Sequence, residues 1–338
     1  MDSIDISLSY MKVPPPKSFI KRLSVHLKSI NEYPSGDYSM LKDRIAKYAR
    51  VKKENIIVGN GSDEIIDIIT RAFGQRVLIP IPTFSQFEEA AKRKGSVIKR
   101  ADSLNGTKYE IKFGKKDLGN STLVWICNPN NPTGSTVPLE KIESVASGTK
   151  AITAIDECLF EYSGDTAVPL LKNYMNMIVT RSMSKAFGIA GIRLGYAIAD
   201  STVIARLEEY RQPFNVNIIA EAAGIAAFDY INYYKRAIER VKMTRQIFTE
   251  ELSKLGLGYI ESSAPFVFVS FGSMAKAKNY YSFLSRHGVK VFPAWDKEFS
   301  GSKLPFIRFS IGTEEEMSKV VEVLAQAQKS VGLPVYIS

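Results

Sequence analysis

Residues 182–195, SMSKAFGIAGIRLG, carry the strongest chemical signal in this 338-residue chain. Ser182, Ser184 and Arg193 offer two hydroxyls and a planar cation, a set suited to binding a phosphate dianion. Lys185 stands among them, and the glycines of the segment allow the backbone to approach a ligand closely. A lysine in a glycine-rich turn can also be an ordinary surface residue. Inside a phosphate-binding cluster, it predicts chemistry at its amine.

Two apolar, strand-like runs end in side chains that can bind an aromatic ring. AIDECLFEY, residues 154–162, places Asp156 where a carboxylate can pair with a protonated pyridine nitrogen. Such an aspartate could equally bind a ribose or cap a helix. CNPNNPTG, residues 127–134, fixes a turn that presents Asn131, whose amide can donate to a phenolate oxygen. The two runs therefore predict ligands for the nitrogen and the oxygen of one ring.

A further strand-to-helix turn, GNGSDE at residues 59–64, predicts a phosphate-binding site. The helix is expected to begin near Ser62, where unpaired N–H groups and the positive end of the helix dipole favour an anion. The spacing matches neither a dinucleotide-binding nor a Walker glycine pattern, so a generic turn remains an alternative at this position.

Short β-branched runs alternate with amphipathic stretches, which indicates a largely parallel sheet covered by helices. We expect strands at 56–58, 76–80, 122–127, 151–155, 177–181 and 195–199, and helices at 63–73, 84–94, 138–147 and 202–210. A long helical stretch is expected from about residue 217 to 255, followed by strands at 266–270, 289–293 and 306–311. We therefore expect an α/β protein with an N-terminal arm at 1–30, a large domain at 31–235 and a small α+β domain at 236–338. Ligands of such open sheets collect at the carboxyl ends of the strands, where the motifs above lie.

Composition narrows the possible functions. The only histidines are His26 and His287, so proton transfer is expected to fall to other groups or to a cofactor, and no metal site is predicted. Cys127 and Cys158 lie in apolar runs, which suits a reducing compartment and argues against a disulfide framework. The net charge of +10 is scattered among acidic residues, so we expect a solvated basic surface and no nucleic-acid partner. With no apolar run of 18 residues or secretion signal, we expect a cytoplasmic protein without a membrane partner.

The four segments, in this order, resemble the fold-type I aminotransferases that depend on pyridoxal 5′-phosphate (PLP), and most closely the histidinol-phosphate aminotransferase family. The resemblance runs from about Tyr33 to Gly312 and implies a mostly parallel seven-stranded sheet in the large, PLP-binding domain. It implies that Lys185 forms a Schiff base with the cofactor, that Asp156 pairs with the ring nitrogen and that Asn131 bonds the ring hydroxyl. The remaining cofactor ligands implied are Phe84, stacked on the ring, and for the phosphate the backbone of Ser62 and Asp63 with the side chains of Ser182, Ser184 and Arg193.

The resemblance also implies substrate and subunit contacts. Arg308, in PFIRFSIGT, matches the arginine that binds the substrate carboxylate, and Tyr10 is the predicted substrate-facing residue of the N-terminal arm. Tyr33 resembles the tyrosine that reaches the cofactor phosphate of a neighbouring subunit, which implies a homodimer with shared sites. The partners implied are an amino acid donor and a keto acid, with 2-oxoglutarate as acceptor.

The sequence departs from the family at positions that affect the ring and the substrate. Leu159 replaces a tyrosine that usually donates a second hydrogen bond to the ring oxygen, and Cys158 stands where a small residue usually packs on the ring. Phe292 falls where histidinol-phosphate enzymes usually have an arginine for the substrate phosphate. An apolar side chain there makes an aromatic or hydrophobic amino acid an alternative donor.

Other activities remain open from the sequence alone. A PLP-dependent decarboxylase of the threonine-phosphate decarboxylase type shares most of these motifs. A nucleotide-dependent dehydrogenase fits the α/β pattern but lacks the glycine fingerprint, and a PLP-binding regulator would need a DNA-binding module that does not precede the fold. We expect an aminotransferase whose donor and pathway the sequence does not identify.

Overall fold

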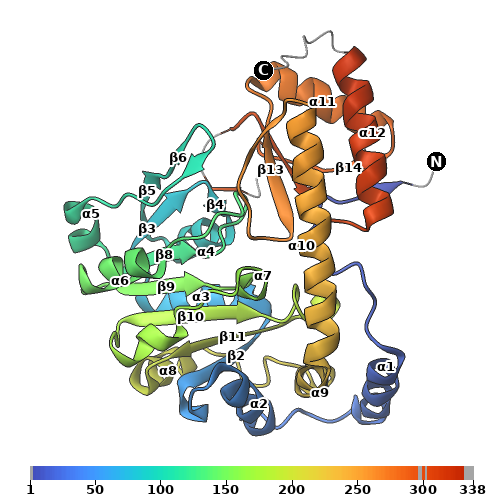
Figure 1. The fold of residues 1–338 in the computed structure, drawn as a ribbon. Helices are drawn as coiled ribbons and strands as arrows, with labels where there is room; N and C mark the ends of the chain where they lie inside the picture. The colour runs from blue at the N-terminus through green and yellow to red at the C-terminus, as the bar shows by residue number, and fades with distance from the viewer. Residues whose placement is uncertain (1–2, 296–298, 301–302, 331–338) are drawn as a thin grey trace.

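The structure is a computed structural model that describes residues 3–295, 299–300 and 303–330. Its large domain is built on a seven-stranded sheet (Figure 1). Along the sheet the strands are β2 (Ile56–Asn60), β11 (Leu194–Ala199), β10 (Met177–Ser182), β9 (Ile152–Asp156), β8 (Leu123–Cys127), β3 (Arg76–Ile81) and β5 (Val97–Asp102). β11 runs antiparallel to the other six strands, which are parallel to one another. The predicted, mostly parallel sheet of seven strands is therefore confirmed.

Both faces of this sheet are buried because consecutive residues of each strand point to opposite sides. On one face, Ile57, Trp125 and Ala154 join a core with the helices α3 (Gly61–Phe73), α4 (Gln86–Lys94) and α8 (Ser201–Glu208). On the other, Val58 and Ile155 join a core with α2 (Ser39–Ala49), α6 (Leu139–Ser147) and α9 (Ile218–Ala227). The near-continuous apolar runs seen in the sequence follow from this two-sided burial.

The small domain contains an antiparallel sheet in the order β12 (Gly258–Ile260), β13 (Phe266–Ser270), β17 (Phe306–Ser310) and β15 (Phe292–Pro293). Its helices are α11 (Met274–Arg286) and α12 (Glu314–Ser330), and α10 (Ile231–Lys254) runs alongside both domains (Figure 1). The predicted boundary at residues 235 and 236 falls inside α10, so the two domains share this helix.

The N-terminal segment starts in the small domain and ends against the large one. The strand β1 (Ile4–Asp5) pairs with β14 (Val289–Lys290), and the chain then descends to α1 (Lys17–Ser24) beside α9 (Figure 1). The remaining short elements are β4 (Thr83–Phe84), which pairs with β16 (Phe299–Ser300), the hairpin β6 (Leu104–Asn105) and β7 (Lys108–Tyr109), α5 (Lys115–Asn120) and α7 (Phe160–Ser163). No helix in the described part of the chain is long and apolar enough to cross a membrane.

Candidate active site

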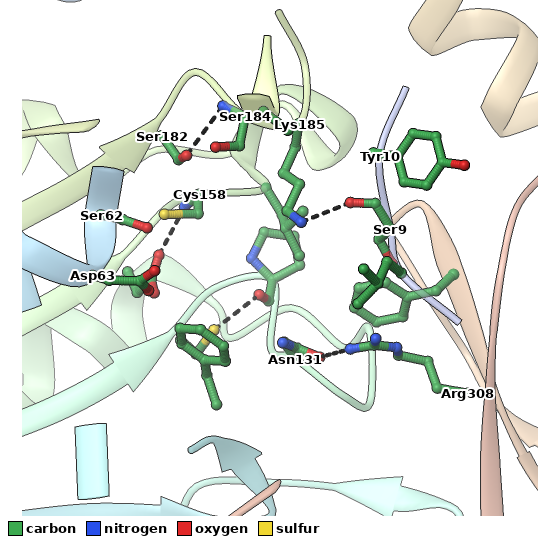
Figure 2. A pocket seen from close by; sticks show the side chains of 18 of the residues that line it. Ser9, Tyr10, Ser62, Asp63, Asn131, Cys158, Ser182, Ser184, Lys185 and Arg308 are labelled. Carbon is green, nitrogen blue, oxygen red and sulfur yellow. Dashed lines mark hydrogen bonds between the residues drawn. The ribbon is translucent and has the colours of Figure 1, made fainter. Parts of the chain in front are cut away.

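A cavity of about 350 Å³ lies at the carboxyl ends of the parallel strands, and residues of the small domain form part of its wall (Figure 2). Most of the residues predicted from the sequence lie on its wall: Tyr10, Ser62, Asp63, Phe84, Asn131, Asp156, Ser182, Ser184, Lys185, Arg193 and Arg308. These side chains come from widely separated parts of the chain, because the carboxyl ends of parallel strands meet at one edge of a sheet.

One end of the cavity carries the features of a phosphate site. The helix α3 begins at Gly61, and Ser62 and Asp63 of its first turn line the cavity. The N–H groups of a first helical turn have no partner within the helix and can bind an anion. A Cβ atom on Gly195 would lie 2.5 Å from the backbone nitrogen of Ser62, so only glycine allows β11 to approach this helix so closely. Arg193 donates to the Asp63 carboxylate across 3.0 Å, which holds the guanidinium beside the start of α3. Ser182 and Ser184 line the same wall.

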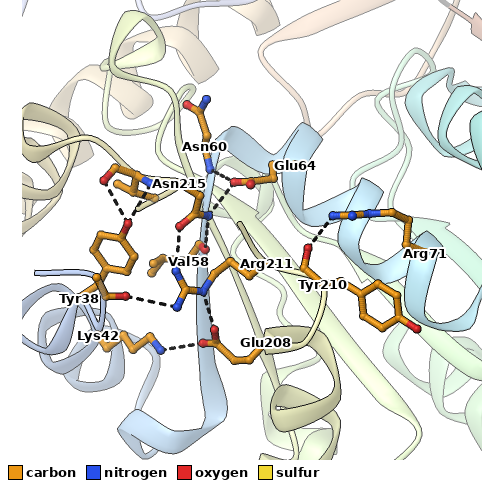
Figure 3. A network of polar contacts seen from close by, with 12 residues as sticks. Tyr38, Lys42, Val58, Asn60, Glu64, Arg71, Glu208, Tyr210, Arg211 and Asn215 are labelled. Atoms are coloured by element: carbon orange, nitrogen blue, oxygen red, sulfur yellow. Dashed lines mark hydrogen bonds and ion pairs between the residues drawn. The ribbon is translucent and has the colours of Figure 1, made fainter. Parts of the chain in front are cut away.

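A polar network behind this turn fixes the start of α3 (Figure 3). The Glu64 carboxylate accepts the backbone N–H of Asn60 at 2.5 Å and the side-chain amide of Asn215 at 2.7 Å. Arg211 donates to the Asn215 Oδ1 atom at 3.1 Å and to the Gly36 carbonyl at 3.2 Å. The network therefore connects the phosphate end of the cavity to the segment that follows Tyr33.

Asp156 is a buried carboxylate at the end of β9. Only 3% of the residue is exposed, and the Cys158 N–H donates to its Oδ1 atom at 2.9 Å. Burial raises the pKa of Asp156 from 3.8 to about 6, and the charges of Asp63 and Glu157 act in the same direction. A cationic group in the cavity would oppose these effects, which is the charge that a protonated pyridine ring provides.

The opposite faces of β9 and β10 carry a buried ion pair. Glu157 follows Asp156 and Arg181 precedes Ser182, so alternation points both side chains away from the cavity. Arg181 donates two hydrogen bonds to Glu157, of 3.1 and 2.9 Å, and its guanidinium carbon lies 3.6 Å from the centroid of the Phe160 ring. This pair fixes the spacing of the strand ends that carry the cavity side chains.

Asn131 and Arg308 are joined at the other end of the cavity. Arg308 Nη1 donates to Asn131 Oδ1 at 2.7 Å, and because a guanidinium can only donate, the amide nitrogen of Asn131 must face the other way. Arg308 is 2% exposed and lies between two rings, with its guanidinium carbon 5.3 Å from the Phe266 centroid and 4.9 Å from that of Phe292. The two contacts hold the planar cation in one orientation.

Lys185 projects between these two ends. Its Nζ atom donates to the backbone carbonyl of Ser9 at 2.6 Å (Figure 2). Phe84 forms part of the facing wall and is supported edge-on by Phe87, which stacks on Trp125 with ring centroids 4.5 Å apart. The aromatic stack gives Phe84 a fixed place on the cavity wall.

The structure places two predicted residues elsewhere. Tyr33 is 81% exposed and packs on Phe214, with ring centroids 4.9 Å apart, and it does not line the cavity of its own chain. Phe292 is the cross-strand neighbour of Arg308 and packs over its guanidinium, away from the cavity wall. The role predicted for Tyr33 requires a second subunit, and Phe292 contacts the Arg308 guanidinium instead of lining the cavity.

Several wall residues were not among the predicted site residues. Leu8, Ser9, Cys127, Pro129, Ala190 and Phe266 line the cavity together with Cys158 and Leu159, the two departures noted in the sequence. Burial raises the pKa of the Cys158 thiol, which keeps it protonated at neutral pH. Leu8 and Ser9 neighbour Tyr10 in the sequence, and that proximity was the only signal available for them.

The cavity residues fit PLP. The phosphate end has two hydroxyls, a guanidinium and a helix start, a buried carboxylate is available for a ring nitrogen, and an amide is available for a ring oxygen. An amine, Lys185, lies on the same wall. No group of three or more His, Cys, Asp or Glu side chains within the described residues could hold a metal ion. The donor set therefore favours an organic phosphate with a basic ring.

Comparisons with known proteins give a consistent result. The profile of the family described as aminotransferase class I and II matches residues 6–324. A histidinol-phosphate aminotransferase of Geobacillus sp. (strain WCH70) is 32% identical over 310 residues, which cover 88% of this chain and 82% of that protein. The crystal structure of the histidinol-phosphate aminotransferase from Clostridium acetobutylicum superposes with a TM-score of 0.87 at 28% identity, covering 97% of this chain and 99% of the other. The same fold is found in the histidinol-phosphate aminotransferase of Sinorhizobium meliloti solved in complex with PLP, with a TM-score of 0.87, 23% identity and coverage of 98% and 92%.

Proposed function

Since this chain belongs to the aminotransferase class I and II family and is a PLP-dependent aminotransferase of fold type I, we propose that it transfers amino groups in the manner of a histidinol-phosphate aminotransferase. In this proposal Lys185 holds the cofactor as a Schiff base and 2-oxoglutarate accepts the amino group. The single observation that supports it most is the meeting of Lys185, Asp156, Asn131 and Arg193 on one cavity wall.

When bound, PLP supplies an electron sink that stabilises negative charge on the carbon that bears the substrate amino group. The chain would hold it with Ser182, Ser184, Arg193 and the first N–H groups of α3 at the phosphate, and with Asp156 at the ring nitrogen. An ionised Asp156 would keep the ring nitrogen protonated. Leu159 has no donor group, so within this subunit's described residues the Asn131 amide is the donor proposed for the ring oxygen.

The remaining residues would orient the substrate and move its proton. Arg308 presents a fixed fork for an anionic group, and the rings of Phe266 and Phe292 hold its plane. The Lys185 amine, when free, would be the general base for the proton on the carbon that bears the substrate amino group. An anion on Arg308 and an amine at Lys185 together define one orientation for the substrate.

The donor is proposed from the anion site. Histidinol phosphate carries one phosphate and no carboxylate, so Arg308 could bind that phosphate in one half-reaction and the carboxylate of the second substrate in the other. An aromatic or hydrophobic amino acid is the second candidate donor. The wall of the cavity includes the side chains of Leu8, Tyr10, Leu159 and Phe266. In addition, Phe292 offers no positive charge for a substrate phosphate.

We also propose that the enzyme is a homodimer. Tyr33 is 81% exposed, and its neighbour Phe214 is 47% exposed. Apolar side chains at 20, 25, 27, 30 and 40 are at least half exposed on the same N-terminal part of the chain. A second copy would cover this surface and bring its Tyr33 to the phosphate end. The two cysteines are unpaired, which suits the cytoplasm as the proposed location.

Borohydride trapping tests the central proposal. The purified protein incubated with PLP should form a reducible adduct whose mass maps to Lys185, and Lys185→Ala should lose both the adduct and turnover. Lys150→Ala, which changes an exposed lysine, serves as the matched control. The assignment would be wrong if the wild-type protein formed no borohydride-reducible adduct with PLP, or if the adduct mapped to another lysine.

A donor panel then separates the candidate reactions. Histidinol phosphate, phenylalanine, tyrosine and aspartate would each be supplied with the PLP-loaded enzyme, and the absorbance of the cofactor followed. Transamination converts the cofactor to its amine form and needs a keto acid to restore it, whereas a decarboxylase releases carbon dioxide and keeps the aldehyde form. Conversion only with phenylalanine or tyrosine would select the second candidate.

A further inference from the structure

The N-terminal strap, residues 3–13, spans the cavity from one domain to the other. Its first half belongs to the small domain, where β1 pairs with β14 and Ile6 is fully buried in the core. Its second half belongs to the large domain, where Met11 is 7% exposed and packs near Gly188. Leu8, Ser9 and Tyr10 lie between the anchors and line the cavity. The strap is therefore held at both ends and covers the site in between.

Two of the cations on the cavity wall, Arg308 and Lys185, donate hydrogen bonds to this strap. The Ser7 carbonyl accepts a hydrogen bond from Arg308 Nη2 at 2.9 Å, and the Ser9 carbonyl accepts one from Lys185 Nζ at 2.6 Å. The strap thus presents two neutral acceptors to the groups that would bind the substrate anion and the cofactor aldehyde.

A pair of buried hydroxyls fixes the strap in this position. Ser9 Oγ and Ser310 Oγ lie 2.7 Å apart although the residues are separated by 301 positions. Ser9 is 6% exposed and Ser310 is 3% exposed, and the Ser310 N–H donates to the Ile6 carbonyl at 3.2 Å. Since Ser310 ends β17, the same strand that carries Arg308, the hydroxyl pair aligns the strap with the anion site.

We propose that Ser9 and Ser310 are positioning residues whose hydrogen bond keeps the strap closed over the cavity, and that the strap must open before PLP reaches Lys185. This inference rests on the proposed role of Lys185. For the amine to react with an aldehyde, Lys185 must give up its bond to the Ser9 carbonyl. Loss of the hydroxyl pair makes that release easier without altering any group that contacts the cofactor.

The rate of PLP uptake by the cofactor-free protein measures this opening. Ser310→Ala and Ser9→Ala should each take up PLP about fivefold faster than the wild type, the factor that one net hydrogen bond provides. The double variant should match the single ones, because the two hydroxyls act through each other. Uptake would be followed by absorbance and by the mass of borohydride-trapped Lys185, and hydrogen exchange of residues 3–13 should rise in the same variants.

Ser103→Ala is the matched control, because Ser103 is 5% exposed and its hydroxyl donates to the Ala101 carbonyl and not to the strap. The double substitution Ser9→Cys with Ser310→Cys supplies the opposite perturbation, since side chains this close can form a disulfide. The oxidised pair should take up PLP more slowly than the same protein after reduction.

The gating inference alone would be wrong if Ser9→Ala and Ser310→Ala took up PLP at the same rate as Ser103→Ala. It would also be wrong if the oxidised and reduced forms of the cysteine pair took up PLP at equal rates. A wild-type protein with no trapped adduct at Lys185 would overturn the proposed function, and the gating inference would fall with it. The two failures are therefore distinguishable in one set of measurements.

Discussion

Replacing Asp156 with asparagine should make the cofactor-free protein more stable at neutral pH. The carboxylate is buried, and its pKa is raised from 3.8 to about 6, mainly by loss of hydration. Each tenfold change in an acid constant corresponds to 1.36 kcal/mol, so holding this group ionised costs the folded state about 3 kcal/mol. Asparagine has the same shape and can still accept the Cys158 N–H, but it carries no charge.

The gain should depend on pH in a defined direction. Because the folded-state pKa of Asp156 is above its unfolded value, the protonated form favours folding, and wild-type stability falls as pH rises from about 4 to about 6. Above that range the cost is constant. The free energy of unfolding of Asp156→Asn should therefore be about 3 kcal/mol higher than that of the wild type at pH 7.5, and almost the same near pH 4.

Urea unfolding of the cofactor-free proteins at the two pH values provides the measurement. Asp102→Asn, on the exposed edge strand β5, serves as the control and should leave the midpoint unchanged at both. Adding PLP should reverse the order of stability at pH 7.5, because a cationic ring pairs with the carboxylate and not with the amide. The reasoning is wrong if Asp156→Asn gives no gain at pH 7.5, or the same gain at both pH values.

Three further substitutions test other parts of the structure. Arg308→Lys keeps the charge but loses the planar fork, so kcat/KM for the amino donor should fall at least about tenfold in steady-state kinetics, and an unchanged value would place the anion elsewhere. Glu157→Gln breaks the buried pair with Arg181 and should lower the free energy of unfolding by about 3 kcal/mol in urea titration, whereas a neutral result would mean that the pair adds no stability. Gly195→Ala puts a Cβ 2.5 Å from the backbone at the start of α3 and should weaken PLP binding by about 1–3 kcal/mol in equilibrium titration. Gly191→Ala, whose Cβ would meet nothing within 4 Å, should bind PLP normally, and equal effects of the two would exclude the steric explanation.

The central sheet could be predicted from sequence because six of its seven strands are almost wholly buried. All six strands expected in the large domain are present, with ends shifted by one or two residues. The edge strand β5, Val97–Asp102, gave no such signal. Lys99, Arg100 and Asp102 are exposed there, since an edge strand has solvent on one side, and its sequence resembles that of a loop.

The cofactor side of the site was predicted more completely than the substrate side. Motif residues such as Asp156 and Asn131 follow buried strands, so their position relative to the sheet is set by local sequence. The contact of Phe292 with Arg308 depends on the register of β15 against β17, which local sequence does not encode. The bond between Ser9 and Ser310 joins two ends of the chain, and neither residue belongs to a motif.

The split origin of the cavity wall affects how such an enzyme can change its preferred donor. The groups assigned to the cofactor come from residues 62–193, whereas those facing the substrate come from the strap, Phe266 and Arg308. Selection could therefore alter the second set while the first stays intact. A chimera that joins a relative's strap and β13–β17 segment to this large domain should acquire the relative's specificity for the amino donor. Its affinity for PLP should stay that of the present enzyme.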